Sequence, residues 1–403
     1  MKMAGFFSKF FAFARKVPDS STGFLQKDTS SLSPYVRRII SDAVLFNEIP
    51  SPMEKEEERT AFIVRRLGEF GVGSVSPDGE GNVAVLFPGT KPTDECALLF
   101  ADIENDAYSP LDSSARLSGG VASGNGLADN SIGVAALLVL AEYFQKNRIQ
   151  HDINIVMLFT RLAYMNEEFA GLRRFLSSWD GKISFAFYVT GIQQGNIEAH
   201  SQGHYKLTVT AHTGEHEVME NSSQASAVSV LSNIAFRLGA IRWDTENSTT
   251  LNIARIVGGV GYGFFPSEGF LELEIYSGTS SALEMTKNAV EATIRKIAAE
   301  TGASVDFTVN SFIPVSDAEI NAFLTDALKK IHGELKIKSS FVSVPDKTAI
   351  LNSFGIPAVS IGITRGKKSL GEEYVELAPV ETGFRQLILL LERGIVHGEL
   401  REP

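Results

Sequence analysis

The stretch that decides the fold is Gly126-Leu127-Ala128-Asp129-Asn130-Ser131-Ile132-Gly133-Val134-Ala135. One acidic residue stands between a glycine turn and a run of small and apolar residues, which predicts a buried helix over residues 130–144. Apolar runs at residues 97–103 and 154–160 flank this helix and are typical of buried strands. Because strands and amphipathic helices alternate here, we predict an α/β domain with a mixed, mainly parallel sheet flanked by helices.

The pattern changes at about residue 203. From there a strand, a helix, two strands, a helix and a final strand follow one another up to residue 309, which is the order of a ferredoxin-like α+β unit. After this unit the alternation of helices and apolar strands returns. We therefore predict a discontinuous α/β domain with an inserted ferredoxin-like lid, the former over residues 33–202 and 311–398 and the latter over residues 203–310.

Composition describes an ordinary globular protein. The chain has 403 residues, of which 44% are hydrophobic and 21% charged. A net charge of -11 argues against nucleic acid as a partner. The single cysteine, Cys96, lies in an apolar run and is expected to be a core residue, with no intrachain disulfide. No run of about 18 apolar residues is present, so we expect no spanning helix and a cytoplasmic location.

Residues 1–32 form a separate N-terminal segment and linker. A helix here would gather Phe6, Phe7, Phe10 and Phe11 on one apolar face with basic residues at its margins. Three interpretations stay open: contact with a membrane surface or large assembly, packing onto the protein's own domain, and a disordered tail.

Six stretches in order resemble a family of dinuclear zinc exopeptidases and deacylases that includes tripeptide aminopeptidase (peptidase T) and acetylornithine deacetylase. The resemblance covers about residues 35 to 395, and its motifs lie at residues 98–104, 126–135, 160–171, 213–216, 258–266 and 355–370. The family has an α/β catalytic domain with an inserted ferredoxin-like lid, in agreement with the pattern above.

The resemblance implies that most of the metal site has been replaced. The first zinc-ligand histidine of the family corresponds to Asp102, and the aspartate that orients it corresponds to Glu104. The metal-bridging aspartate is retained as Asp129, whereas the next aspartate ligand corresponds to Thr190 and the last histidine to Lys368.

The resemblance also implies that the catalytic base is lost. The general-base glutamate corresponds to Ala163 and the adjacent ligand glutamate to Tyr164. The lid histidine is kept as His216, but the substrate-binding asparagine and arginine of the lid correspond to Gly263 and Tyr276.

The positions of the seven histidines support part of this interpretation without an alignment. No histidine precedes His151, and none lies between His332 and His397. A shift of the motifs by a few residues therefore restores neither family histidine. Threonine is a poor zinc ligand and protonated lysine is none, so we expect no metal and no cofactor.

One alternative keeps a metal. Glu167 and Glu168 become the glutamate pair if the preceding loop is longer, although they also fit the acidic first turn of a helix. An oxygen-rich site from Asp102, Glu104, Asp129 and Glu167 would suit magnesium, calcium or manganese better than zinc.

A second hypothesis needs no metal. Asp102 and Asp129 would face one another, and unpaired buried carboxylates are costly. Lys368 would then bridge the two aspartates and replace the missing positive charge. The alternative is that Lys368 is a solvated loop lysine.

Three functions follow from these expectations. The first is a peptidase-like protein that has lost zinc-dependent hydrolysis and serves as a binding or scaffold protein, with self-association through the lid. The second is a divergent metal-dependent peptidase or N-acyl amino acid deacylase with a rebuilt site that holds zinc or another divalent ion. The third is a small-molecule sensor that uses the old cleft.

Overall fold

The computed structural model describes most of the chain after the N-terminal segment. The described ranges are residues 33–50, 56–73, 75–79, 81–104, 114–161, 169–198, 201–214, 225–241, 248–316, 319–342, 347–369 and 372–392. The phenylalanine-rich helix predicted within residues 1–32 lies outside them.

A six-stranded sheet forms the centre of the larger body, in the order β1-β2-β6-β3-β7-β14. Neighbouring strands from β6 to β14 run parallel, whereas β1 and β2 join antiparallel, so the predicted mixed, mainly parallel sheet is confirmed. The strands span Val75–Pro77 (β1), Val83–Phe87 (β2), Glu95–Asp102 (β3), Asn154–Thr160 (β6), Lys182–Thr190 (β7) and Ala358–Gly362 (β14). The central strands are nearly all apolar because both of their faces are covered.

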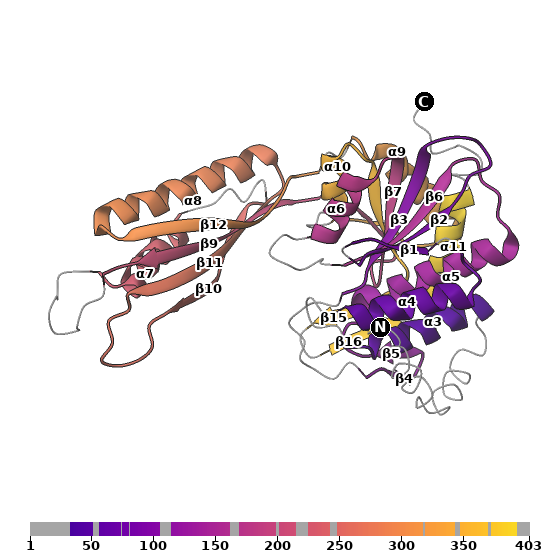
Figure 1. The fold of residues 1–403 in the computed structure, drawn as a ribbon, viewed down its shortest axis with the longest axis horizontal. Helices are drawn as coiled ribbons and strands as arrows, with labels where there is room; N and C mark the ends of the chain where they lie inside the picture. Colours follow the sequence, from indigo (N-terminus) through magenta and orange to yellow (C-terminus); the bar gives the residue numbers. More distant parts are fainter. Residues whose placement is uncertain are drawn as a thin grey trace, which may run out of the picture.

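Helices cover both faces of this sheet (Figure 1). One face packs against α3, α4, α5, α9 and α11, and the other against α6 and α10. These helices span Pro34–Asn47 (α3), Glu57–Glu69 (α4), Ile132–Asn147 (α5), Ala170–Ser178 (α6), Ala322–Leu335 (α9), Thr348–Ser353 (α10) and Pro379–Leu391 (α11).

The helix of the deciding stretch starts two residues later than predicted. Residues Leu127–Ser131 form a π-helical turn, and the regular helix α5 begins at Ile132. Together they make the one stretch of the described chain that is long and apolar enough to cross a membrane, but 89% of its most apolar window is buried inside the protein. We therefore interpret α5 as a core helix.

A second body consists of a four-stranded antiparallel sheet with two helices on one face. Its elements are β9 (Gly203–His212), α7 (Ala227–Gly239), β10 (Thr250–Gly258), β11 (Glu268–Ser277), α8 (Ser280–Thr301) and β12 (Ser304–Ile313). The sheet order β10-β11-β9-β12 with this chain order is ferredoxin-like, which confirms the predicted fold of the lid. The lid projects away from the larger body and is joined to it through β9 and β12 (Figure 1).

Two small sheets were not predicted. One has the order β15-β16-β5-β4, and the other pairs β13 with β8. Their strands span Arg116–Ser118 (β4), Val121–Ser123 (β5), Asn196–Glu198 (β8), Ser340–Val342 (β13), Gly366–Ser369 (β15) and Glu372–Glu376 (β16). The β15–β16 hairpin is rich in charged residues, so it lacks the apolar alternation that identifies a strand.

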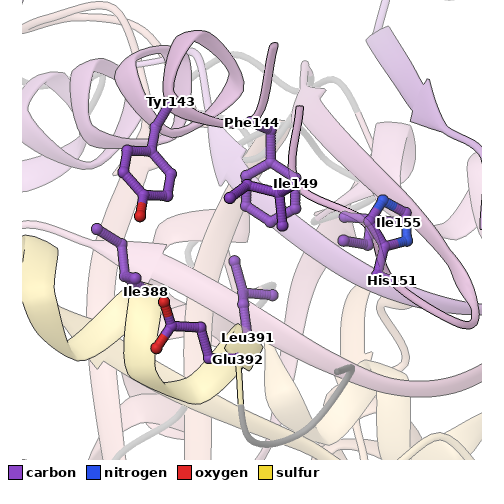
Figure 2. A pocket seen from close by; sticks show the side chains of 8 residues that line it. All are labelled: Tyr143, Phe144, Ile149, His151, Ile155, Ile388, Leu391 and Glu392. Carbon is purple, nitrogen blue, oxygen red and sulfur yellow. The ribbon is translucent and has the colours of Figure 1, made fainter. Parts of the chain in front are cut away.

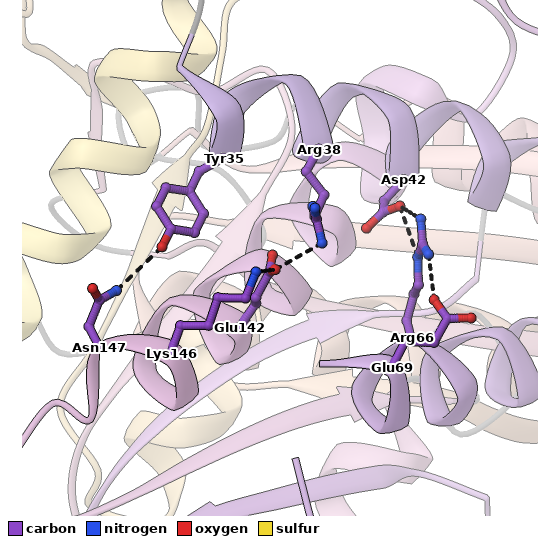
Figure 3. A network of polar contacts seen from close by, with 8 residues as sticks. All are labelled: Tyr35, Arg38, Asp42, Arg66, Glu69, Glu142, Lys146 and Asn147. Carbon is purple, nitrogen blue, oxygen red and sulfur yellow. Dashed lines mark hydrogen bonds and ion pairs between the residues drawn. The ribbon is translucent and has the colours of Figure 1, made fainter. Parts of the chain in front are cut away.

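Ion pairs connect three of the helices on one face of the six-stranded sheet, α3, α4 and α5 (Figure 3). Glu142 of α5 is 1% exposed and contacts Arg38 of α3 at 2.8 Å and Lys146 at 2.5 Å. Asp42 of α3 is fully buried and accepts a 3.0 Å hydrogen bond from Nε of Arg66 in α4. Burial raises the pKa of Asp42, and the Arg66 guanidinium opposes that rise. These contacts fix α3 against α4 and α5 in the layer above the sheet.

A small, mainly apolar hollow, partly open to solvent, lies between the end of α5 and α11 (Figure 2). His151 at its wall is buried, and its Nδ1 lies 2.6 Å from the carbonyl oxygen of Ile153. Another buried imidazole, His332, bonds to Gln386 and Ser339. Burial lowers the pKa of both histidines.

These two imidazoles should make stability fall at mildly acidic pH. Their pKa is about 6.5 in the unfolded chain and lower in the folded protein, so the unfolded chain takes up protons at a higher pH than the folded protein does. The free energy of unfolding should therefore drop as the pH falls from the unfolded pKa to the folded pKa. Urea unfolding at pH 7.5 and 5.5 measures this drop, which should be smaller in a His151→Gln/His332→Gln variant. An equal drop in both proteins would contradict the assignment.

Candidate functional site

The candidate site lies at the carboxyl edge of the parallel strands, where ligands bind in open α/β sheets. Strand β3 ends at Asp102, and the turn that carries Asp129 packs directly on the end of β7. This packing needs glycine: a Cβ on Gly133 would lie 2.6 Å from the Val189 carbonyl oxygen, and one on Gly191 would lie 2.0 Å from the Ala128 carbonyl oxygen. The close contact of Gly133 with β7 thus fixes the position of the turn that carries Asp129.

Asp102 is 2% exposed, and both of its carboxylate oxygens are engaged. Oδ1 accepts a 2.6 Å hydrogen bond from the Thr160 hydroxyl on the adjacent strand β6. Oδ2 accepts one from the Tyr188 hydroxyl at 3.1 Å and forms an ion pair with Nζ of Lys347 at 2.5 Å. The negative charge is therefore fully compensated within the protein.

Lys347 is the main feature that the sequence analysis missed. Its ammonium group donates to the Tyr188 hydroxyl at 2.7 Å and lies 4.4 Å from the centre of that ring and 5.3 Å from the Phe169 ring. The residue is 8% exposed and is the N-cap of α10, where the helix dipole disfavours a cation. The charge of Asp102 and the two aromatic rings compensate for that unfavourable position.

Asp129 has its own cation. Nζ of Lys368 lies 2.9 Å from Oδ2 of Asp129, although this oxygen accepts no well-aligned hydrogen bond within the described residues. The contact is thus a charge pair with the side chain of Lys368 36% exposed. Lys368 therefore pairs with Asp129 alone and does not bridge the two aspartates, because the ammonium group on Asp102 comes from Lys347.

Glu373 stands opposite Lys368 in the β15–β16 pair and also belongs to the cluster. Its Oε1 accepts a 2.8 Å hydrogen bond from the backbone N–H of Ala128, next to Asp129. Burial raises the pKa of Glu373, and backbone N–H groups together with Lys368 oppose the rise. Sequence analysis missed this residue because the small sheet that carries it was not predicted.

A further cation, Arg59, is buried near the acidic residues of the site. Arg59 is 1% exposed, donates to the carbonyl oxygens of Ile49 at 3.0 Å and Ile103 at 2.7 Å, and lies over the Phe46 ring. Burial lowers its pKa to about 10, whereas the charges of Asp129 and Glu104 act to raise it. Glu104 is itself 1% exposed, and its backbone oxygen accepts a hydrogen bond from the Asn130 amide.

The other predicted positions are distributed as follows. Thr190 ends β7, is nearly buried, and its carbonyl oxygen accepts a 3.1 Å hydrogen bond from the Ile363 N–H. In the lid, Gly263 lies in a loop at positive φ, and the Tyr276 hydroxyl donates to Glu274 at 3.0 Å. The remaining predicted positions lie outside the described residues: Ala163, Tyr164, Glu167, Glu168 and His216.

The described residues do not fit a dinuclear metal centre. Within the described ranges, no group of three or more histidine, cysteine, aspartate or glutamate side chains is arranged to hold a metal ion. Asp102 and Asp129 each pair with a lysine ammonium group of the same chain. Buried His151, His204 and His332 are bonded elsewhere, to a backbone carbonyl, Ser311 and Gln386.

Solved structures that share this fold include several peptidases. Aminopeptidase PepT from Bacillus cereus gives a TM-score of 0.69 at 15% identity, covering 91% of this chain and 98% of that chain. A tripeptidase from Staphylococcus aureus gives a TM-score of 0.70 at 14% identity, covering 89% of this chain and 98% of that chain. A dinuclear metal binding peptidase of the M20 family from Bacillus subtilis gives a TM-score of 0.61 at 16% identity, covering 88% of this chain and 97% of that chain.

These structural relatives match the exopeptidase family that the sequence motifs resemble, and at this identity they show the fold. No protein-family model matches the sequence, and no curated protein is similar to it.

The two lysines should differ in their effect on stability. Lys347→Met would leave the Asp102 charge buried without its cation and should lower the free energy of unfolding by about 3–5 kcal/mol. Lys368→Met removes a partly exposed pair and should cost about 1 kcal/mol or less. Lys367→Met, which removes an exposed lysine beside Lys368, is the matched control with no measurable effect expected. Urea unfolding gives the ranking, and a harmless Lys347→Met would contradict the assigned pair.

Proposed function

We propose that this protein is a non-catalytic relative of the M20 metallopeptidases that serves as a binding or scaffold protein. One observation carries the proposal: the two aspartates at the expected metal site are each paired with a lysine of the same chain. A metal-activated water needs open coordination positions and a nearby base. Lysine ammonium groups at these carboxylates offer neither.

The replacement of the catalytic base in the sequence points the same way. Alanine at position 163 accepts no proton, and the family's last histidine ligand corresponds to Lys368. The fold is kept while the groups that do the chemistry are changed, as expected when selection acts on shape and binding. We infer that no metal or other cofactor is required.

Peptidase assays test this proposal directly. The purified full-length protein should not hydrolyse tripeptides or N-acyl amino acids above the buffer rate, with zinc or manganese added. The solved tripeptidase fold relatives supply the positive control for the assay. Hydrolysis that depends on added metal and disappears in an Asp129→Asn variant would establish a rebuilt active site and overturn the proposal.

We also propose that the lid is the interaction surface and binds a second copy of the chain. The loop between β10 and β11 carries no charged residue from Gly258 to Ser267. Three of its four large apolar side chains are strongly exposed, with 84% for Val260, 106% for Tyr262 and 66% for Phe264. Large exposed apolar patches are typical of protein interaction sites. Strand β10 beside this loop is an edge strand, to which another chain can add.

Light scattering coupled to size-exclusion chromatography tests the lid proposal. The wild-type protein should dimerise, and Tyr262→Ser/Phe264→Ser should weaken the dimer at least about tenfold because aromatic anchors dominate interfaces. Phe341→Ser, which removes an aromatic side chain 61% exposed on β13 outside the lid, should leave the dimer unchanged. A wild-type monomer at every concentration would contradict self-association through the lid.

A further inference from the structure

The family resemblance implies metal ions beside Asp102 and Asp129, whereas this chain has a lysine beside each. We propose that Lys347 and Lys368 are built-in counter-ions that replace two metal ions and exclude divalent cations from Asp102 and Asp129. This inference rests on the proposed loss of metal-dependent catalysis and deepens it, because it assigns a physical role to the two lysines.

The positions of the two lysines match the two aspartates. Each aspartate receives one ammonium group, at 2.5 Å for Asp102 and 2.9 Å for Asp129. The two lysines come from different elements, α10 and β15, which reach the site from separate parts of the chain. A single bridging lysine would leave one of the two carboxylates with a weaker partner, whereas two separate cations match a site built for two ions.

The placement of Lys347 is energetically costly. A lysine at a helix N-cap opposes the helix dipole, and a nearly buried lysine loses most of its hydration. Both conditions apply to Lys347. Its ammonium group contacts the Tyr188 hydroxyl and lies near the rings of Tyr188 and Phe169. Such a placement is explained if a positive charge is required at Asp102.

The two lysines stand at oxygen atoms that a divalent cation could bind. Without the two ammonium groups, the cluster would offer hard oxygen atoms from Asp102, Asp129, Thr160 and Tyr188. The Tyr188 hydroxyl lies 3.1 Å from Asp102 and 3.4 Å from the side-chain oxygen of Asn130, the residue that follows Asp129 in the chain. Oxygen ligands suit manganese and magnesium rather than zinc. The lysines therefore compete with a divalent cation of this class for the same carboxylates.

Metal rescue tests the proposal. In the full-length protein, Lys347→Met/Lys368→Met keeps the aliphatic stems and removes both charges. Its melting temperature should be lower than that of the wild type and should rise with the logarithm of the manganese concentration. The wild type and the Lys367→Met control should show no such rise. Isothermal titration with manganese should show binding to the double variant only.

Manganese binding to the variants and to the wild type decides the proposal. A folded double variant that neither binds manganese nor gains stability from it would overturn the replacement of metal ions by lysines. Manganese binding to the wild type would also overturn it, because the lysines would then not exclude the ion. If the double variant does not fold, Lys368→Met alone is used, since that side chain is partly exposed; manganese stabilisation of this variant supports the inference and its absence overturns it.

A final variant separates charge from packing. Asp102→Asn in the Lys347→Met background removes both charges of the buried pair and should recover most of the lost stability without manganese. Failure to recover would mean that Lys347 acts through packing. The peptidase assay on the wild type is independent of all these measurements, so the proposed function and this inference can fail separately.

Discussion

The rest of the site depends on the need to neutralise two carboxylates held at the carboxyl edge of the central sheet. Asp102 ends the buried strand β3 and is almost completely shielded from water, so its charge requires a partner. The partner is Lys347, and Tyr188 and Thr160 satisfy the remaining positions of the carboxylate. Asp129 is placed beside it by the close packing of the π-helical turn against β7, and Lys368 supplies the second cation.

The sequence predicted the fold and half of this cluster. The motif around Asp129 and the apolar runs on either side identify the sheet, the core helix and the lid, because hydrophobic periodicity and glycine positions carry that information. The correspondence with a known family placed Asp102, Asp129 and Lys368 at one site, and in the structure Lys347 pairs with Asp102 while Lys368 pairs with Asp129.

The sequence did not predict Lys347, because a lysine just before a short apolar helix is normally solvated. Its burial depends on tertiary contacts with Tyr188 and Phe169, which are distant along the chain. Glu373 was missed for a related reason: the charged hairpin that carries it has no apolar alternation, and its strand β16 pairs with β5, which is distant along the chain. Local pattern is informative about buried strands and core helices, and much less so about polar residues whose environment is set by distant segments.

One measurement tests most directly the proposal that this fold has exchanged metal ions for lysine side chains. That measurement is the metal content of the purified full-length protein, followed by zinc and manganese titration. The account predicts no stoichiometric metal and no binding in the micromolar range. One or two tightly bound ions per chain would contradict it, and would make a rebuilt metallohydrolase the better explanation of the fold.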